Sequence, residues 1–209
     1  MKKSFQYIDL SIPLTNQTQV YPGDPIVSIS PVCGIEKDGF SMHSFHFGGH
    51  SGTHIDAQSH FITGGKHIDE YGPEKFVGEG KVIDARERNV IDIDILKNIT
   101  LKKDAVVLFY TDYIKNREEV TYFENYPVVG KTLAERLISI GVKMIGIDAP
   151  SIDHEPYPLH KMLLGNDILI LENLCNLDQI YKKKLQVYAF PIKVPTDGVP
   201  VRVVAEVRL

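Results

Sequence analysis

Short apolar runs separated by polar, turn-forming segments are the main pattern along the chain. Such runs, bounded by Gly, Pro, Asn or Asp, are typical of buried strands. Residues 26–31 instead alternate apolar and small polar side chains, which indicates an exposed edge strand. The predicted strands are residues 5–12, 26–31, 81–84, 105–110, 142–148, 167–172, 185–190 and 201–207.

Two other segments place their apolar residues at helical spacing. The first begins at Ile91 and reads IDIDILKNI, with Asp92 as its candidate N-cap. In the second, Thr132 precedes LAERLISI, Glu135 follows three residues later, and Gly141 comes directly after the last apolar residue. This arrangement predicts a helix with a capping box at its start and a C′ glycine at its end.

The predicted strands outnumber the helices, and the two types are interspersed along the chain. This order favours an α/β fold, with α+β as the alternative, built on a mixed sheet. The chain has 209 residues, of which 43% are hydrophobic, and no Pro/Gly/Ser-rich linker divides it. Residues 1–209 are therefore predicted to form a single domain around one well-buried core.

Composition and charge narrow the range of partners. The formal net charge is −4 and the pI is about 6.1, so no nucleic-acid partner is expected. No apolar segment has the length of a signal peptide core or a membrane span, so no membrane partner is expected either. The two cysteines, Cys33 and Cys175, lie far apart. Such sparse cysteines favour a cytoplasmic location over an oxidising one.

Candidate chemistry is concentrated in one short stretch, HSGTHIDAQSH, which begins at His50. Six of the eight histidines lie between residues 43 and 67. Within this stretch His50, His54, Asp56 and His60 are all separated by even numbers of positions, and in an extended chain residues two apart share a face. These side chains and that of Gln58 are therefore predicted to project in the same direction. Glycines in and before the stretch disfavour the alternative, a helix, by about 1 kcal/mol each.

Two imidazoles and one carboxylate form a ligand set that suits Zn²⁺, with Mn²⁺ or Fe²⁺ as alternatives. Three protein ligands leave a coordination position for water, which a bound metal can ionise near neutral pH into a nucleophile. His60 is then either a fourth ligand or a general acid and base. The stretch thus predicts a metal-dependent hydrolase, with a metal-binding protein without turnover as the alternative.

Polar residues also follow two of the predicted buried strands, at Asp148 and Glu172. A carboxylate at the end of an apolar strand must be solvated, paired or metal-bound. Spacing alone does not decide among these three states. Glu172 is thus a candidate metal ligand on sequence grounds.

The string HSGTHIDAQSHF closely resembles the signature HxGTHxDxPxH of the cyclase family of metal-dependent hydrolases. This family includes bacterial kynurenine formamidases (arylformamidases) and isatin hydrolases. Further segments resemble other parts of the family in the expected order, over most of the chain. They are IDLSIPL and YPGDP near the N-terminus, GIDAPSIDH in the middle, and ILENL and FPIKVPTDGVPVRVVA toward the C-terminus.

The resemblance implies a specific division of roles within the site. In the formamidase branch, the positions matching His50, His54 and Asp56 hold a first metal ion. Asp56 and Glu172 would bridge to a second ion, and His160 would complete that second site. The position matching His60 is the proton donor and acceptor.

The same resemblance implies the family's swivelling β/β/α fold and a homo-oligomer, either a dimer or a tetramer. It also implies one or two zinc ions, or manganese as in isatin hydrolases. The leading expectation is hydrolysis of an aryl formamide such as N-formylkynurenine, a small-molecule substrate. Opening of a cyclic amide or lactone is the alternative.

The sequence departs from the family pattern at two positions. Gln58 replaces the proline of the signature, and Tyr21 stands where kynurenine formamidases commonly have Trp. Both side chains are predicted to contact the substrate, because an amide can hydrogen-bond and a tyrosine ring can stack on an aromatic group. Specificity is expected to depend on the loops at residues 13–25, 61–80 and 111–130.

Overall fold

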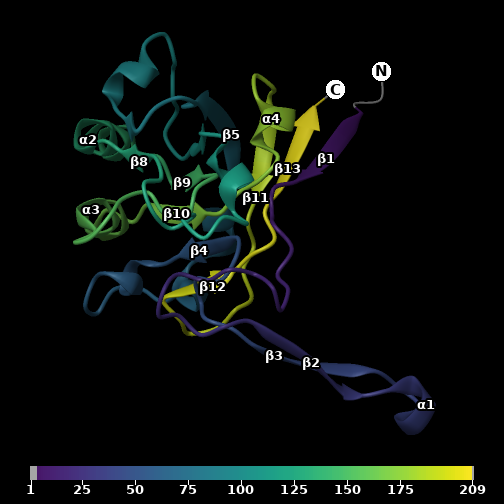
Figure 1. Ribbon diagram of the computed structural model, residues 1–209. Helices are drawn as coiled ribbons and strands as arrows, with labels where there is room; N and C mark the ends of the chain where they lie inside the picture. Colours follow the sequence, from purple (N-terminus) through teal and green to yellow (C-terminus); the bar gives the residue numbers. More distant parts are fainter. Residues whose placement is uncertain (1–3, 209) are drawn as a thin grey trace.

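A computed structural model describes residues 4–208 of the chain. Nine strands in this part of the chain form one mixed sheet (Figure 1). In sheet order they are β1 (Phe5–Asp9), β13 (Val204–Arg208), β11 (Leu185–Tyr188), β5 (Val77–Asp84), β7 (Val106–Tyr110), β9 (Met144–Ile147), β10 (Leu169–Glu172), β4 (His54–Asp56) and β12 (Gly198–Pro200). The central strands β5, β7, β9 and β10 are parallel, and the strands on either side of them are antiparallel. The predicted α/β fold with a mixed sheet is confirmed.

The remaining elements are short. The helices are α1 (Ile35–Asp38), α2 (Lys131–Ile140), α3 (Pro158–Gly165) and α4 (Leu177–Ile180). Single 3-10 turns are η1 (Gln58–His60), η2 (Ile68–Glu70), η3 (Pro73–Phe76), η4 (Ile93–Leu96) and η5 (Tyr113–Asn116). Two further strand pairs lie outside the main sheet: β2 (Ser28–Cys33) with β3 (Met42–His46), and β6 (Val90–Ile91) with β8 (Val128–Val129).

The central strand β7 shows how the sheet divides the apolar core. All five of its residues are buried. Val106 and Leu108 belong to a first core on one face of the sheet, and Val107 and Phe109 belong to a second core on the other face. Helices α2 and α3 cover the second core (Figure 1). Burial on both faces explains why these parallel strands read as continuous apolar runs.

The helix predictions were right about position and partly wrong about detail. Helix α2 begins at Lys131 after Gly130, which has no side-chain cap, so the predicted capping box of Thr132 and Glu135 was wrong. The helix starts two residues earlier than that box requires, since Thr132 as N-cap would make Leu133 the first helical residue. Gly141 ends it in the left-handed conformation, with φ 76°, as predicted. The segment from Ile91 forms only the single turn η4, in which the Asp92 side chain accepts a hydrogen bond from Ile93 N.

Strands β2 and β3 form a hairpin that projects away from the rest of the molecule, with α1 at its tip (Figure 1). We call residues 26–46 the arm. Its predicted edge strand is β2, but that strand pairs with β3 and not with the main sheet. Several apolar side chains of the arm are exposed, including Ile35 at 70% and Phe45 at 67%. The arm therefore makes little use of the core that stabilises the other elements.

Candidate active site

Strand pairing brings three of the predicted metal ligands together. In the antiparallel pair of β4 and β10, His54 lies opposite Glu172, and Asp56 lies two residues along β4 from His54. Residues two apart in a strand, and residues directly opposite each other, share a face of the sheet. Ile55 points into the first core. The other three side chains therefore project from the opposite face, and all three are buried.

His50 and His60 reach the same place from turns at either end of β4, not from an extended chain. The prediction of an extended chain across this stretch is thus correct only for His54–Asp56. His50 lies in a glycine-rich turn, and its Nδ1 is 2.8 Å from Asp56 Oδ1. His60 is the last residue of η1, and its ring stacks on that of His50 with 4.0 Å between the centroids. On the His50 side a turn replaces the strand because Gly52 adopts φ +63°, which an extended chain excludes.

A carbonyl group fixes the orientation of His54. Its Nδ1 donates a hydrogen bond to Gly52 O at 2.8 Å, which directs Nε2 toward the carboxylates of Asp56 and Glu172. The Asn173 side chain also donates to Gly52 O at 3.1 Å. Thr53 Oγ1 donates to the Asn173 backbone carbonyl at 2.6 Å. The turn before β4 is therefore anchored to the end of β10.

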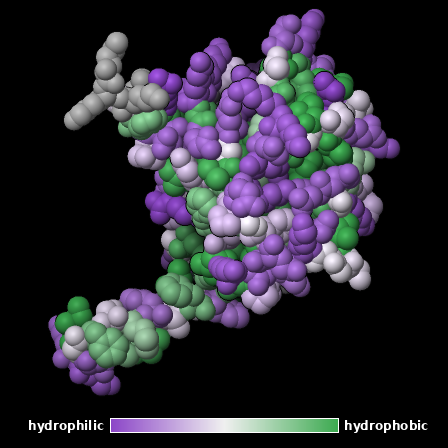
Figure 2. All heavy atoms as spheres, turned by 180° about the vertical axis from the view of Figure 1, so that it is seen from behind, coloured by the Kyte–Doolittle hydropathy of each residue, from purple (hydrophilic) through white to green (hydrophobic). Residues whose placement is uncertain are grey.

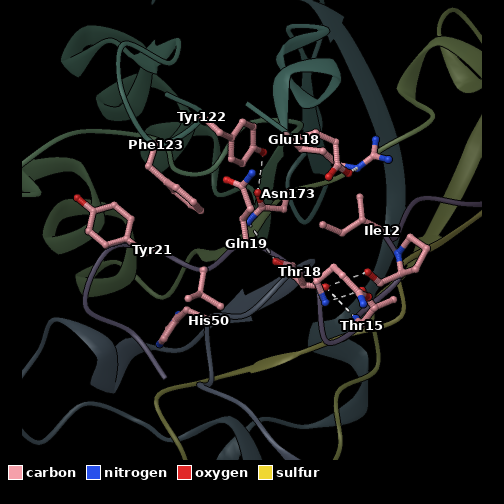
Figure 3. Close-up of a pocket in the computed structure, with 15 residues that line it drawn as sticks. Ile12, Thr15, Thr18, Gln19, Tyr21, His50, Glu118, Tyr122, Phe123 and Asn173 are labelled. Atoms are coloured by element: carbon pink, nitrogen blue, oxygen red, sulfur yellow. Dashed lines mark hydrogen bonds and ion pairs between the residues drawn. The ribbon is translucent and has the colours of Figure 1, made fainter. Parts of the chain in front are cut away.

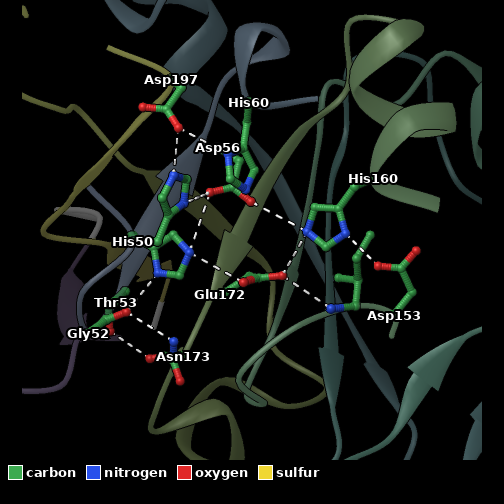
Figure 4. Close-up of polar contacts among 12 residues, drawn as sticks. His50, Gly52, Thr53, Asp56, His60, Asp153, His160, Glu172, Asn173 and Asp197 are labelled. Atoms are coloured by element: carbon green, nitrogen blue, oxygen red, sulfur yellow. Dashed lines mark hydrogen bonds and ion pairs between the residues drawn. The ribbon is translucent and has the colours of Figure 1, made fainter. Parts of the chain in front are cut away.

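His160 enters the cluster from the first turn of α3. Its Nδ1 donates to Asp153 Oδ1 at 2.5 Å, and Asp153 Oδ2 accepts a hydrogen bond from Leu159 N at 2.6 Å. This leaves Nε2 of His160 facing Glu172 and Asp56 (Figure 4). A carboxylate behind a histidine in this way is the usual support of an imidazole metal ligand.

The distances within the cluster suit metal ligands better than hydrogen-bond partners. His54 Nε2 lies 3.4 Å from Asp56 Oδ1 and 3.3 Å from Glu172 Oε2. His160 Nε2 lies 3.6 Å from Asp56 Oδ2 and 3.2 Å from Glu172 Oε1. Two ligands of one tetrahedral zinc ion lie roughly 3.3–3.6 Å apart, because each bond is about 2.0–2.2 Å long. Each carboxylate thus has one oxygen near His54 and the other near His160.

Asp56 provides the strongest test of whether a cation fits. The side chain has no exposed surface, and its Oδ2 has no hydrogen-bond partner among residues 4–208. A buried carboxylate oxygen without a partner is costly and needs an explanation. Two ligand groups within reach of one ion, His50–Asp56–His60 and His54–Asp56–Glu172, both include Asp56. The donor set therefore fits bound metal.

Imidazole and carboxylate groups, which can carry opposite charges, lie close together in the cluster. Burial disfavours a charged His50, but the carboxylates of Asp56 and Asp197 outweigh it and raise the His50 pKa to about 10. Burial likewise disfavours a charged His160, yet the hydrogen bond to Asp153 and the nearby carboxylates raise its pKa well above the usual value. Because an imidazole nitrogen must be unprotonated to bind a metal, a cation entering here displaces protons.

A cavity of about 200 Å³ opens beside the cluster. Histidines and Glu172 form one side of it. Aromatic rings form much of the rest, together with Asp24, Pro150, Ser151 and Asn173. Each of the three loops expected to control specificity supplies one ring: Tyr21, Phe61 and Phe123. Tyr157 adds a fourth ring, and its hydroxyl lies 3.0 Å from that of Tyr21. The walls suit a planar aromatic group.

A second cavity adjoins the first (Figure 3). The two share Tyr21, His50, Phe123 and Asn173 among their lining residues. Together they can hold a substrate that extends beyond its reacting group. Gln58 lines neither cavity; its Oε1 accepts a hydrogen bond from Lys66 N at 3.1 Å. The structure therefore brings Tyr21 to the cavity but not Gln58.

Three polar residues of the site were not found from the sequence. Asp153 supports His160, Asn173 supports the turn before β4, and Asp197 contacts both His50 and His60. Asp153 lies within the segment GIDAPSIDH and Asp197 within FPIKVPTDGVPVRVVA, which carried the family resemblance. The resemblance could have drawn attention to them, but periodicity could not. Asp148, the other strand-end carboxylate, is paired with Thr111 and Asp112 outside the cluster.

The geometry agrees with comparisons to known proteins. The family model described as "Putative cyclase" matches residues 8–154. The chain belongs to this cyclase family. It is 30% identical to the kynurenine formamidase of Bacillus cytotoxicus over 207 residues, covering 97% of this chain and 98% of that enzyme. It is 34% identical to the kynurenine formamidase of Geobacillus thermodenitrificans, covering 94% of this chain and 95% of that enzyme.

Solved structures similar to this cyclase-family chain include isatin hydrolases. Isatin hydrolase A from Labrenzia aggregata, bound to benzyl benzoate, superposes with a TM-score of 0.89 at 25% identity over 98% of this chain and 94% of that one. An isatin hydrolase bound to the product analogue thioisatinate gives a TM-score of 0.88 at 25% identity, covering 98% and 93% of the two chains. These relatives confirm the predicted family and the prediction of a metal-dependent hydrolase that acts on C–N bonds other than peptide bonds.

Proposed function

We propose that this cyclase-family protein hydrolyses the amide bond of an aryl formamide, with N-formylkynurenine as the leading substrate. The observation that carries the proposal is the cluster of imidazoles and carboxylates facing a cavity with aromatic walls. The two relatives named kynurenine formamidase, at 30% and 34% identity over nearly the whole chain, support this substrate.

The metal sites follow from the donor atoms. We propose that His50, His54 and Asp56 hold one ion, and that His160 and Glu172, with Asp56, hold a second. Imidazole and carboxylate donors at these separations favour Zn²⁺, with Mn²⁺ as the alternative. A bound ion would polarise the formyl carbonyl and lower the pKa of water at the site.

The protein's own residues orient the substrate and move the proton. His60 lines the cavity and lies beside His50, so its imidazole can take a proton from the attacking water and return it to the departing aryl nitrogen. Tyr21 and Phe123 pack edge to face, with 5.6 Å between their centroids, and would position the aromatic ring of the substrate.

Opening of a cyclic amide is the second candidate function. The TM-scores of 0.89 and 0.88 to isatin hydrolases favour it, since the same cluster and the same aromatic cavity could act on a ring amide. The two functions differ in whether the leaving nitrogen remains joined to the product.

A substrate panel with controlled metal content tests the proposal. We expect the purified protein to contain zinc and to hydrolyse N-formylkynurenine and formanilide faster than isatin. Chelation should reduce hydrolysis to background, because it removes the Lewis acid, and added Zn²⁺ should restore it. Faster turnover of isatin would favour the cyclic-amide function. Bound metal without hydrolysis of any substrate would leave a metal-binding protein and contradict the proposal.

We further propose that the protein is a homo-oligomer, a dimer at least, assembled through the arm. The arm exposes apolar side chains on an element that projects from the molecule (Figures 1 and 2), including Ile26 at 74%. Exposed apolar surface of this kind marks interaction sites. Burial of each such side chain against a second copy would contribute about 1.5–3 kcal/mol.

If the arm forms the interface, substitutions in it should change the mass of the protein in solution. Replacing both Ile35 and Phe45 with Asp should convert the oligomer to monomer, because the interface would then bury unpaired carboxylates. Light scattering coupled to size-exclusion chromatography measures the mass. Val120→Asp is the matched control, since Val120 is 94% exposed on a loop outside the arm. A wild-type protein that is monomeric at high concentration would contradict the proposal.

The organisation and location of the chain are inferred from its composition. We propose that residues 1–209 form one catalytic domain, and that the protein is cytoplasmic. The described residues support the location, since Cys33 and Cys175 are both free thiols. Within residues 4–208 no helix has the length and apolar character needed to cross a membrane.

A further inference from the structure

Asp197 contacts two histidines of the site through a single oxygen atom. Its Oδ2 lies 3.0 Å from His50 Nε2 and 3.0 Å from His60 Nδ1 (Figure 4). The two histidines flank β4, whereas Asp197 precedes β12, more than a hundred residues later in the chain. The contact exists because β12 pairs with β4, with Gly198 opposite Asp56.

The position of Asp197 is itself fixed on both sides. Thr196 Oγ1 donates to its other carboxylate oxygen, Oδ1, at 3.0 Å. The Asp197 backbone carbonyl accepts a hydrogen bond from Ala57 N at 2.8 Å. A group held by its own hydrogen bonds can orient its neighbours at little cost in entropy.

For His50, the contact determines which nitrogen faces the metal ligands. Asp197 accepts from Nε2, so Nδ1 is directed at Asp56 Oδ1, 2.8 Å away. Gly198 leaves room for the ring, because a Cβ there would lie 2.5 Å from His50 Cε1. The Asp197–Gly198 pair thus sets both the rotation and the depth of the His50 ring.

For His60, the contact determines the tautomer. An ionised carboxylate only accepts hydrogen bonds, so the proton of neutral His60 is placed on Nδ1. Nε2 is then free to accept a proton at the cavity. An asparagine in place of Asp197 could donate to Nδ1 instead, and the His60 proton would move to Nε2.

We infer that Asp197 is a positioning residue that orients the metal ligand His50 and the proton carrier His60 together. Its action through His60 rests on the proposed function, whereas its action through His50 requires only that the site binds metal. No step of hydrolysis passes through Asp197 itself.

Asp197→Asn tests the inference, because it keeps the size of the side chain and removes its charge. We expect zinc affinity, measured by competition with a chromogenic chelator, to fall about 10- to 100-fold. At saturating zinc, kcat should fall by a similar factor while KM stays nearly constant. Asp94→Asn is the matched control, since Asp94 pairs with Arg88 at the surface and should change neither quantity.

A double-mutant cycle distinguishes positioning of His60 from a general structural loss. At saturating zinc, His60→Gln/Asp197→Asn should have a kcat within about threefold of His60→Gln alone, since both changes remove the same proton carrier. If the two losses multiply instead, Asp197 does not act through His60. Equal thermal unfolding of wild type and Asp197→Asn would show that the fold is retained.

The tautomer can be observed without metal or substrate. Long-range ¹H–¹⁵N correlation spectra of the metal-free protein, with His60 assigned from His60→Gln, should show the Nδ1–H form of neutral His60 in wild type. In Asp197→Asn we expect the Nε2–H form to increase. An unchanged tautomer together with unchanged zinc affinity would overturn the inference. If wild type hydrolyses no substrate, the proposed function fails, but the affinity and the spectra still decide the role of Asp197.

Discussion

Asp56→Asn is expected to abolish hydrolysis and to remove metal from both proposed sites. Asp56 belongs to both proposed sites, with Oδ1 toward His50 and His54 and Oδ2 toward His160. Asparagine keeps one oxygen and replaces the other with an NH₂ group, which cannot bind a cation. We expect activity to fall beyond about 10⁴-fold, the upper range for loss of a general acid or base alone.

Metal content measured by mass spectrometry, together with kcat/KM, checks this prediction. Asp148→Asn is the control for burial, since Asp148 is also buried but is paired with Thr111 and Asp112. It should reduce thermal stability, because a backbone N–H loses its acceptor, and yet leave the metal bound. An Asp56→Asn protein with a full complement of metal would show that the bridging role is wrong.

His60→Gln is expected to lower kcat by about 10²- to 10⁴-fold, the usual contribution of a positioned acid or base. Glutamine can fill the space and hydrogen-bond, but it cannot carry a proton between water and the leaving nitrogen. Zinc content should stay at the wild-type value. His67→Gln provides the control, because the exposed His67 contacts Ser59 and does not line the cavity.

Metal analysis of His60→Gln also separates the two roles left open for this residue. His60 lies in one ligand group with His50 and Asp56, whose donor atoms are within 4.8 Å of one another. If the variant loses metal along with activity, His60 is a ligand. If it keeps metal and full activity, His60 is neither a ligand nor the proton carrier.

The parallel strands and the first ligands were the parts that sequence could predict. The buried strands β7, β9 and β10 are continuous apolar runs, as is typical of parallel strands that are buried on both faces. His50, His54 and Asp56 fall within seven residues, so any compact local conformation brings them together. The even spacing predicted the correct group of residues but, for His50, the wrong backbone conformation.

Other features depend on contacts between distant segments, which periodicity does not record. Asp197 reaches the histidines only through the pairing of β12 with β4. His160 was assigned only by resemblance to a family, and Glu172 was a candidate from its place at a strand end until the resemblance gave it a role. Gln58 was expected at the substrate, but its side chain contacts Lys66 instead. Gln58 and His60 both lie in η1, and residues that are two positions apart in a 3-10 turn do not share a face.

The metal site can form only when β4 and β10 pair in the native register. A slip of one residue in this pairing would turn Ile55 toward the cavity and bury His54 and Asp56 in the first core. An incompletely folded chain keeps the ligands near His50 but lacks those supplied by α3 and β10. Occupancy of the second metal site would therefore show that β10 has paired with β4 in the native register. Excess zinc would favour this native pairing over its alternatives by mass action.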